Sequence, residues 1–468
     1  MVATQRRSAT RARGRAPKRS PAARLLAGRA DFGVASAYLV LLSLFGGGPV
    51  VWSAGYMLLA VATIAVAVLL AWRAGLSAFR DIPLTGRLAL AGVALLPLLQ
   101  LIPLPPGVWQ ALPGQELRRE ILSLAGLDGR WQPISLEPVG TALSALFAAG
   151  CVALIGFLMR VSEEDFDRIL RLVWALVLVN IALGLSQVVT DGQFPKLFRA
   201  NQGGTMLGLY ANKNHMALAI ACSIPLFGFV VGRRLLARDK RKAATIGYMI
   251  FGMVCVVTTN SRAGLGLGVL ACAVTAADLA RGTPLRWKIT GLALSASFLA
   301  LIFSTAAFDL VSGRLDDVDG DLRWSLAAWS WPLAERYWAL GSGAGSFATL
   351  FAANERLAWV KPTHVNHVHN EYLQLVIEFG VAGVVVLALL LLSLVPAFRA
   401  FRRRTRRDPH WGVGAFGLCA LLLMLLHGVV DYPLRRPGGW MLFAVALAAA
   451  YRTRGAPVRA DRPGGDTA

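Results

Sequence analysis

Long apolar runs separated by short hydrophilic breaks make up most of the 468-residue chain. Runs such as 56–72 and 141–159 have the length and the low charge of helices that cross a bilayer. We therefore predict an all-α polytopic membrane protein with about 12 transmembrane helices. The expected spans are 32–52, 54–72, 88–104, 140–159, 169–189, 215–232, 244–260, 264–280, 289–307, 371–397, 411–430 and 438–451.

Basic residues occur in every second break. Of the 48 Lys and Arg residues, 34 lie in 1–30, 73–87, 160–171, 233–242, 281–288, 399–407 and 452–462. Because loops rich in Lys and Arg remain on the cytoplasmic side, this alternation predicts an even number of spans with both termini in the cytoplasm.

The same alternation divides the chain into five parts. These are a disordered basic cytoplasmic tail (1–30), helices 1–9 with short loops (31–307), a large outward loop (308–370), helices 10–12 (371–452) and a cytoplasmic tail (453–468). In the large loop, 321–338 has helical spacing, with Leu322, Leu326, Trp329 and Leu333 on one face, which indicates a helix at the membrane surface. The glycine-rich stretch 341–347 predicts a flexible turn after it.

Composition supports the membrane class and excludes others. The chain is 56% hydrophobic and only 16% charged. The net charge of +22 is concentrated in the breaks and is accompanied by no nucleic-acid-binding motif, so we expect membrane lipids rather than nucleic acid as its partner. The five cysteines lie in apolar runs without a CxxC pair, which indicates neither disulfides nor a thiolate metal site.

Several polar residues stand at the outward ends of the predicted spans. Arg262 lies between two apolar runs, where a guanidinium is costly and usually functional, and its planar fork suits phosphate oxygens. The alternative is a structural ion pair. Asn212 and Asn214 are either helix caps or part of a site, and Lys213 beside them indicates an anion nearby.

Half of the six histidines, His364, His367 and His369, fall within six residues. Their spacing does not place all three on one helix face, so a metal site is disfavoured. His369 directly precedes an apolar run, where a neutral imidazole can accept a proton from a hydroxyl. A histidine that only caps the helix start is the other interpretation.

The stretch HNEYLQLVIEFGVAG begins at His369 and continues with Gly380 and Gly383. It resembles the H-[NSQ]-x9-G-x-x-[GTY] signature of the bacterial O-antigen ligase family. Three other elements are similar to patterns of the wider ligase and polymerase superfamily, and with the signature they span about 195–385. They are SRAG at 261–264, ANKNHMA at 211–217, and Arg323 ahead of the glycine-rich turn.

The resemblance implies a metal-independent inverting glycosyltransferase of the bacterial inner membrane, with a GT-C-like fold and no cofactor. Its donor would be a glycan on undecaprenyl diphosphate at the periplasmic face, and its acceptor lipid A–core or a growing glycan. His369 would activate the acceptor hydroxyl and Arg262 would hold the diphosphate. Further candidates for diphosphate or glycan contacts are Arg323, Arg199, Lys213, Asn212, Asn214, Asn370 and Glu371, of which Glu371 could also orient His369.

Other functions remain open from the sequence. The signature favours a ligase over an O-antigen or exopolysaccharide polymerase. A small-anion transporter is also possible, because the superfamily includes proteins described as bicarbonate carriers. However, transport sites lie near the bilayer midplane, whereas these polar residues gather at the outward face.

Overall fold

Helices dominate the part of the protein that the computed structural model describes, which is residues 21–48, 53–195, 204–281, 284, 286, 322–357, 360 and 364–455. Within these residues, nine segments are long and apolar enough to cross a membrane. They lie in α1 (Pro21–Phe45), α2 (Ala54–Arg73), α6 (Pro138–Arg160), α7 (Glu163–Val189), α8 (Lys213–Leu226) continued by a π-helical segment and α9 (Gly232–Leu235), α10 (Arg238–Thr258), α11 (Arg262–Leu279), α16 (Glu371–Arg403) and α17 (Pro409–His427).

The predicted all-α polytopic class is confirmed. Two more predicted spans coincide with the helices α3 (Leu84–Leu99) and α18 (Pro437–Gly455), which are not among the nine. The predicted span 289–307 lies outside the described residues, as do 1–20 and 456–468 of the two predicted tails. Residues 21–30, which were predicted to be disordered, instead form the first part of α1. The count of twelve and the GT-C-like arrangement therefore stay predictions.

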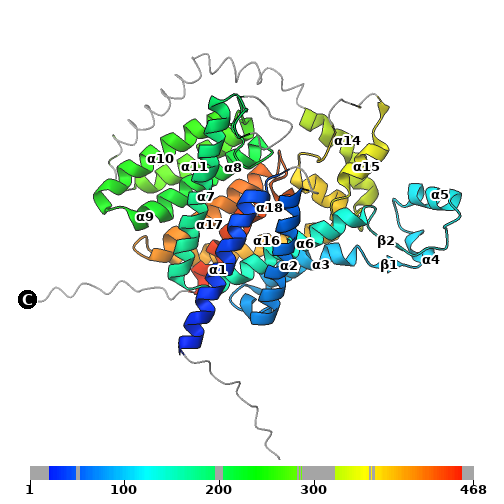
Figure 1. Ribbon diagram of the computed structural model, residues 1–468, viewed down its shortest axis with the longest axis horizontal. Coiled ribbons are helices and arrows are strands. Elements are labelled where there is room, and N and C mark those ends of the chain that lie inside the picture. Colours follow the sequence, from blue (N-terminus) through cyan, green and yellow to red (C-terminus); the bar gives the residue numbers. More distant parts are fainter. Residues whose placement is uncertain are drawn as a thin grey trace, which may run out of the picture.

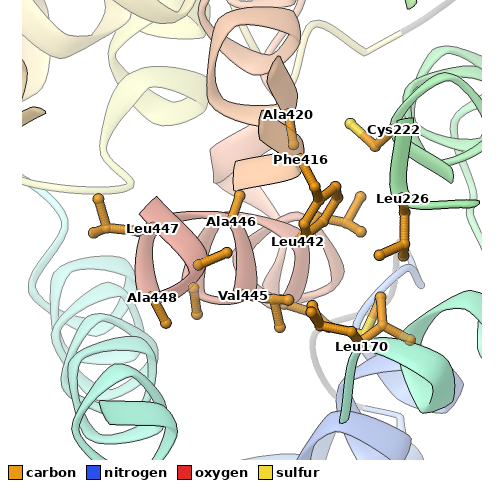
Figure 2. Packing of buried hydrophobic residues seen from close by; sticks show 14 of the residues in the cluster. Leu170, Cys222, Leu226, Phe416, Ala420, Leu442, Val445, Ala446, Leu447 and Ala448 are labelled. Atoms are coloured by element: carbon orange, nitrogen blue, oxygen red, sulfur yellow. The ribbon is translucent and has the colours of Figure 1, made fainter. Parts of the chain in front are cut away.

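The core of the bundle is built around α18 and α8. Figure 1 shows α18 in the middle of the bundle, with α1, α7 and α17 around it. Residues Ala444–Ala450 of α18 are wholly buried, and residues 214–231 of α8 and the π-helical segment that continues it are also buried. Figure 2 shows side chains of α7, α8 and α17 directed at α18, among them Leu170, Leu226 and Phe416. Small residues in α18 allow neighbouring helices to approach closely, as is common in membrane bundles.

Ion pairs join the helix ends that the charge pattern places on the cytoplasmic side. Asp31 of α1 accepts from Arg73 (2.8 Å) at the end of α2 and from Arg160 (2.9 Å) at the end of α6. Arg452 at the end of α18 lies 2.7 Å from Glu163 at the start of α7. Breaks far apart in sequence thus meet at one end of the bundle, as the predicted alternation requires.

A smaller layer lies beside the opposite helix ends. It contains α14 (Leu322–Tyr337), α15 (Phe347–Asn354) and a hairpin in which β1 (Pro103–Leu104) pairs antiparallel with β2 (Gln132–Pro133), with α4 (Pro106–Trp109) and α5 (Glu116–Leu124) between them (Figure 1). The predicted helix at 321–338 is confirmed as α14. Leu326 and Leu333 of its predicted apolar face are 3% and 4% exposed, and Trp329 packs beside them.

The span predicted as one helix over 371–397 is interrupted at Gly380. This residue has φ 59° and ψ −150°, a conformation adopted almost only by glycine, so α16 consists of two helices joined at a kink. At the kink, backbone groups of α16 form hydrogen bonds with the preceding loop instead of within the helix. The Val381 N–H donates to the carbonyl oxygen of Trp338 (2.7 Å), and the carbonyl oxygen of Ile377 accepts from the Ser342 N–H (2.9 Å). An alanine Cβ at Gly380 would lie 2.7 Å from the Trp338 oxygen.

Replacing Gly380 with alanine is therefore expected to destabilise the protein by about 1–3 kcal/mol. The measurement is the thermal unfolding midpoint of the detergent-solubilised protein. Gly266→Ala in α11 is the matched control, because nothing lies within 4 Å of the position that an alanine Cβ would take there and helical propensity favours alanine. Equal midpoints for the two variants would contradict this account of the kink.

Candidate functional site

A buried carboxylate, Asp431, is the centre of the candidate site. It lies in the connection between α17 and α18 and its side chain is 0% exposed. Three histidine nitrogens surround it: His215 Nε2 at 3.7 Å, His369 Nδ1 at 3.8 Å and His427 Nε2 at 3.6 Å. The Tyr432 N–H donates to the same carboxylate at 2.8 Å. Residues from three distant parts of the chain therefore meet at one acid.

Two amides complete the environment of Asp431. Asn214 Nδ2 donates to Oδ2 at 2.5 Å, and Asn212 Nδ2 donates to Oδ1 at 3.4 Å. Asn212 also caps α8, since its oxygen accepts from the Asn214 N–H at 2.8 Å. Thus the cap interpretation of Asn212 is confirmed, whereas Asn214 orients the acid. Contacts of either residue with substrate stay predictions.

Of the three histidines at Asp431, His369 is the most accessible. Its side chain is 29% exposed, compared with 6% for His215 and 0% for His427. Its backbone has φ 60°, an uncommon left-handed conformation for a residue other than glycine. It directly precedes Asn370, the N-cap of α16. Because Nδ1 is the nitrogen nearest Asp431, the ring can present Nε2 to a bound molecule.

The ring of Tyr432 lies among three histidines and connects His367 with the two already described, His369 and His215. Its ring centroid lies 4.0 Å from that of His367, 4.9 Å from His369 and 5.2 Å from His215. Burial, together with the nearby charges of Arg436 and Arg435, lowers the pKa of His367 well below its ordinary value. His367 is therefore a neutral packing neighbour of the site, while His364 is exposed.

Electrostatics keep Asp431 ionised. Burial alone would raise its pKa, but interactions with His215 and His427 hold the pKa of this carboxyl well below its ordinary value. A negative charge retained in a buried position stabilises a neighbouring imidazole when that ring takes up a proton.

The depressed pKa predicts a pH-dependent contribution to stability. Such a group stabilises the fold above its unfolded pKa of about 3.9 and loses this contribution as the pH falls through the folded value. Wild-type protein is expected to exceed Asp431→Asn in stability by about 1.5–3 kcal/mol near pH 6, and this lead is expected to shrink progressively as the pH falls below about 4 toward the lower folded pKa. Unfolding midpoints between pH 6 and pH 3 measure this, with exposed Asp128→Asn as control. A constant lead over this range would contradict the assignment.

Two predicted cations stand at neighbouring helix starts. Lys213 is the first residue of α8, and Arg262 is the first residue of α11. The two starts are joined through Ser261, whose hydroxyl donates to the Asn214 oxygen at 2.7 Å and accepts from the Gly264 N–H at 2.9 Å. Helix N-termini favour anions, so this edge of the cluster suits phosphate.

The other predicted residues are placed as follows. Arg323 lies near the start of α14, and its charge acts on Tyr432 of the cluster. Asn370 is committed to protein contacts, capping α16 with its oxygen and donating Nδ2 to Val429 at 3.0 Å. Arg199 lies outside the described residues. Contacts of these residues with substrate stay predictions.

Glu371 does not orient His369, contrary to the prediction. Its carboxylate accepts from Arg435 at 2.7 Å and from the Leu434 N–H at 3.2 Å, and Arg435 also pairs with buried Glu378. The first turn of α16 rotates this side chain toward the α17–α18 connection. Asp431, rather than Glu371, is the acid beside His369.

Sequence reasoning did not select Asp431, His427 and Tyr432 for the site. Their local signal is the His-x3-Asp spacing directly after an apolar run, which places an acid one helical turn beyond a histidine. Among the described residues, no group of three or more His, Cys, Asp or Glu side chains has the arrangement of a metal site. The expectation of a metal-independent reaction stays a prediction.

Fold and site together define a multi-pass α-helical membrane protein with a carboxylate–histidine cluster at one end of its bundle. A family model described as O-Antigen ligase matches residues 247–388, a stretch that contains Arg262, Arg323 and His369. The match covers less than a third of the chain, and it bears out the resemblance to the O-antigen ligase family found in the sequence. No curated protein sequence matches the chain. The family match supports ligase- or polymerase-type glycan transfer in a bacterial membrane.

Proposed function

We propose that this protein transfers a glycan from an undecaprenyl-diphosphate-linked donor to an acceptor hydroxyl at the periplasmic face of the inner membrane. O-antigen ligation to lipid A–core is the preferred reaction. The observation that carries the proposal is His369, the partly exposed histidine of the Asp431 cluster, lying within the O-antigen ligase match. The alternative is polymerisation of an O-antigen or exopolysaccharide, which uses the same donor chemistry on a different acceptor.

The proposed reaction is a direct displacement. The acceptor hydroxyl oxygen attacks the anomeric carbon of the donor while the bond from that carbon to the diphosphate oxygen breaks. The bonding electron pair leaves with the diphosphate, and the hydroxyl proton passes to His369 Nε2. One inversion at the anomeric carbon follows, and no nucleotide or metal is required because the diphosphate is already an activated leaving group.

Asp431 acts as a positioning residue in this scheme. It faces His369 Nδ1 at 3.8 Å, so its negative charge favours the tautomer with a proton on Nδ1 and leaves Nε2 as the base. As His369 becomes positively charged in the transfer, the adjacent carboxylate stabilises it. The buried rings of His215 and His427 lie beside the same carboxylate, at 3.7 and 3.6 Å.

Basic residues are assigned the binding of the diphosphate leaving group. Arg262 and Lys213 at the starts of α11 and α8, with Arg323 of α14, are proposed to bind the diphosphate and stabilise its developing charge. Arg199 is proposed to assist them. Arginine suits this task because its planar fork binds phosphate oxygens in pairs and stays charged at any relevant pH.

Deletion of the gene separates the two candidate reactions. If the protein is a ligase, cells that lack it accumulate fully polymerised glycan on the lipid carrier, without transfer to lipid A–core. If it is a polymerase, such cells accumulate single repeating units instead. Unchanged surface and lipid-linked glycans would count against both reactions.

A further inference from the structure

Two adjacent arginines in the α17–α18 connection differ in their ion pairs. The guanidinium of Arg435 is paired with Glu371 and Glu378. Arg436 is half-buried, yet in the described part of the chain no carboxylate lies within ion-pair distance of it, and its side chain makes no hydrogen bond. Taking a guanidinium partly out of water without a counter-charge is unfavourable, so the position suits an anion that arrives from outside.

Arg436 belongs to the same α17–α18 connection as Asp431 and Tyr432. It lies four residues after Tyr432, and its charge acts on both the Tyr432 ring and His367. The Tyr432 ring is in turn 4.9 Å from that of His369. The cations proposed above for the diphosphate come from α8, α11 and α14, whereas Arg436 lies directly before the start of α18.

We propose that Arg436 binds phosphate oxygens of the donor's diphosphate. The inference rests on the proposed function for the identity of this donor. The shared chemistry is a lipid phosphate, which both the polyprenyl diphosphate and ordinary phospholipid headgroups present, so the test has to separate these two sources.

Lipid binding to full-length protein in detergent, measured by native mass spectrometry, tests the inference. The probes are undecaprenyl diphosphate and phosphatidylglycerol. Arg436→Gln is expected to weaken undecaprenyl diphosphate binding about 10- to 100-fold, the range for one lost charged hydrogen-bonding group, with phosphatidylglycerol binding unchanged. Arg80→Gln, which removes an exposed arginine after α2, is the charge-matched control and is expected to behave like wild type.

Arg436→Lys separates loss of charge from misfolding. It retains the positive charge and is expected to bind undecaprenyl diphosphate more tightly than Arg436→Gln. Unchanged diphosphate affinity in Arg436→Gln overturns the inference, and so does an equal loss for phosphatidylglycerol. If wild-type protein transfers glycan while Arg436→Gln binds normally, only this inference fails. If Arg436 is required for binding but wild type transfers no glycan, the proposed function fails and the phosphate site stands.

A second, independent observation concerns α5. Leu117, Ile121 and Leu124 are spaced i, i+4 and i+7 along this helix and are 51%, 55% and 84% exposed, so its apolar stripe points away from the protein. No residue of α5 is buried.

The other side of α5 is fixed to the protein. Arg118 donates to the carbonyl oxygens of Pro133 (2.7 Å) and Ser135 (2.5 Å). The Tyr337 hydroxyl donates to Gly114 at 2.8 Å, which attaches the hairpin to α14. The outward direction of the apolar stripe is therefore set by the fold.

The helices at either end of the hairpin also expose apolar side chains. Leu98 and Leu99 end α3, and Val139 begins α6, a candidate membrane span; these side chains are 49%, 52% and 55% exposed. Trp131 of the hairpin is 62% exposed, and tryptophan is typical of membrane interfaces. We infer that α5 lies along the membrane surface with its stripe in the boundary between headgroups and acyl chains.

Photo-crosslinking tests this placement. A diazirine amino acid is introduced at Leu124, or at exposed Arg119 on the opposite face as control, in full-length protein in phosphatidylethanolamine–phosphatidylglycerol nanodiscs. Lipid adducts are expected from position 124 and not from 119. Equal adducts at the two positions, or crosslinks from 124 to a second protein copy in place of lipid, overturn the inference.

Discussion

Replacing His369 with alanine is expected to lower the rate of glycan transfer by about 10²- to 10⁴-fold, the range for loss of a general base. The loss should appear in kcat, because the hydroxyl still binds but no group takes its proton. The measurement is the initial rate with undecaprenyl-diphosphate-linked glycan and a saturating acceptor. The unfolding midpoint should stay close to that of wild type, because the side chain is partly exposed.

Matched variants separate this role from a structural one. His364→Ala removes an exposed histidine five residues earlier and is expected to retain wild-type activity. Asp431→Asn is expected to lower kcat, with little change in the KM for the donor, because the acid contacts the histidine rather than the substrate. Full activity in His369→Ala would refute the assigned base.

Replacing Arg262 with alanine is expected to lower transfer by about 10²- to 10³-fold, the loss typical when one charge-stabilising group is removed from a transition state. Arg262 is exposed at the start of α11, so the loss should not arise from unfolding. The measurement is kcat/KM for the donor, together with donor affinity. Arg262→Lys retains the charge without the planar fork and is expected to be intermediate.

Arg119→Ala on α5 is the control for removal of an exposed arginine outside the cluster, and it should retain wild-type transfer. If Arg262→Ala and Arg119→Ala have equal rates, the diphosphate role of Arg262 is wrong.

Much of the helical framework was predictable because apolar runs and basic breaks report on the membrane directly. The joining of Arg73, Arg160 and Asp31 at one bundle end agrees with the alternation of charge. The kink at Gly380 was not predictable from hydropathy, because an apolar pattern does not specify backbone dihedrals. That glycine belongs to the family signature, and the structure gives it a local reason: the preceding loop packs against the kink.

The candidate site was only partly predictable. His369 was recognised because its motif is local. Asp431 was not selected, because it meets Asn214 across 217 residues and no local pattern encodes such a contact. Glu371 was assigned by sequence proximity to His369, yet the helical turn directs it to Arg435. Local motifs identify reacting groups well, whereas the residues that hold them are set by tertiary packing.

The most direct test of glycan transfer uses purified wild-type protein in nanodiscs with an undecaprenyl-diphosphate-linked glycan and a chelator. Lipid A–core and lipid-linked glycan are offered as acceptors in separate reactions, and product and released undecaprenyl diphosphate are quantified together. We predict glycosylated lipid A–core with an inverted anomeric centre and one undecaprenyl diphosphate released per glycan transferred. Absence of a glycosylated product with either acceptor, in protein that is folded and binds the donor, would contradict the account.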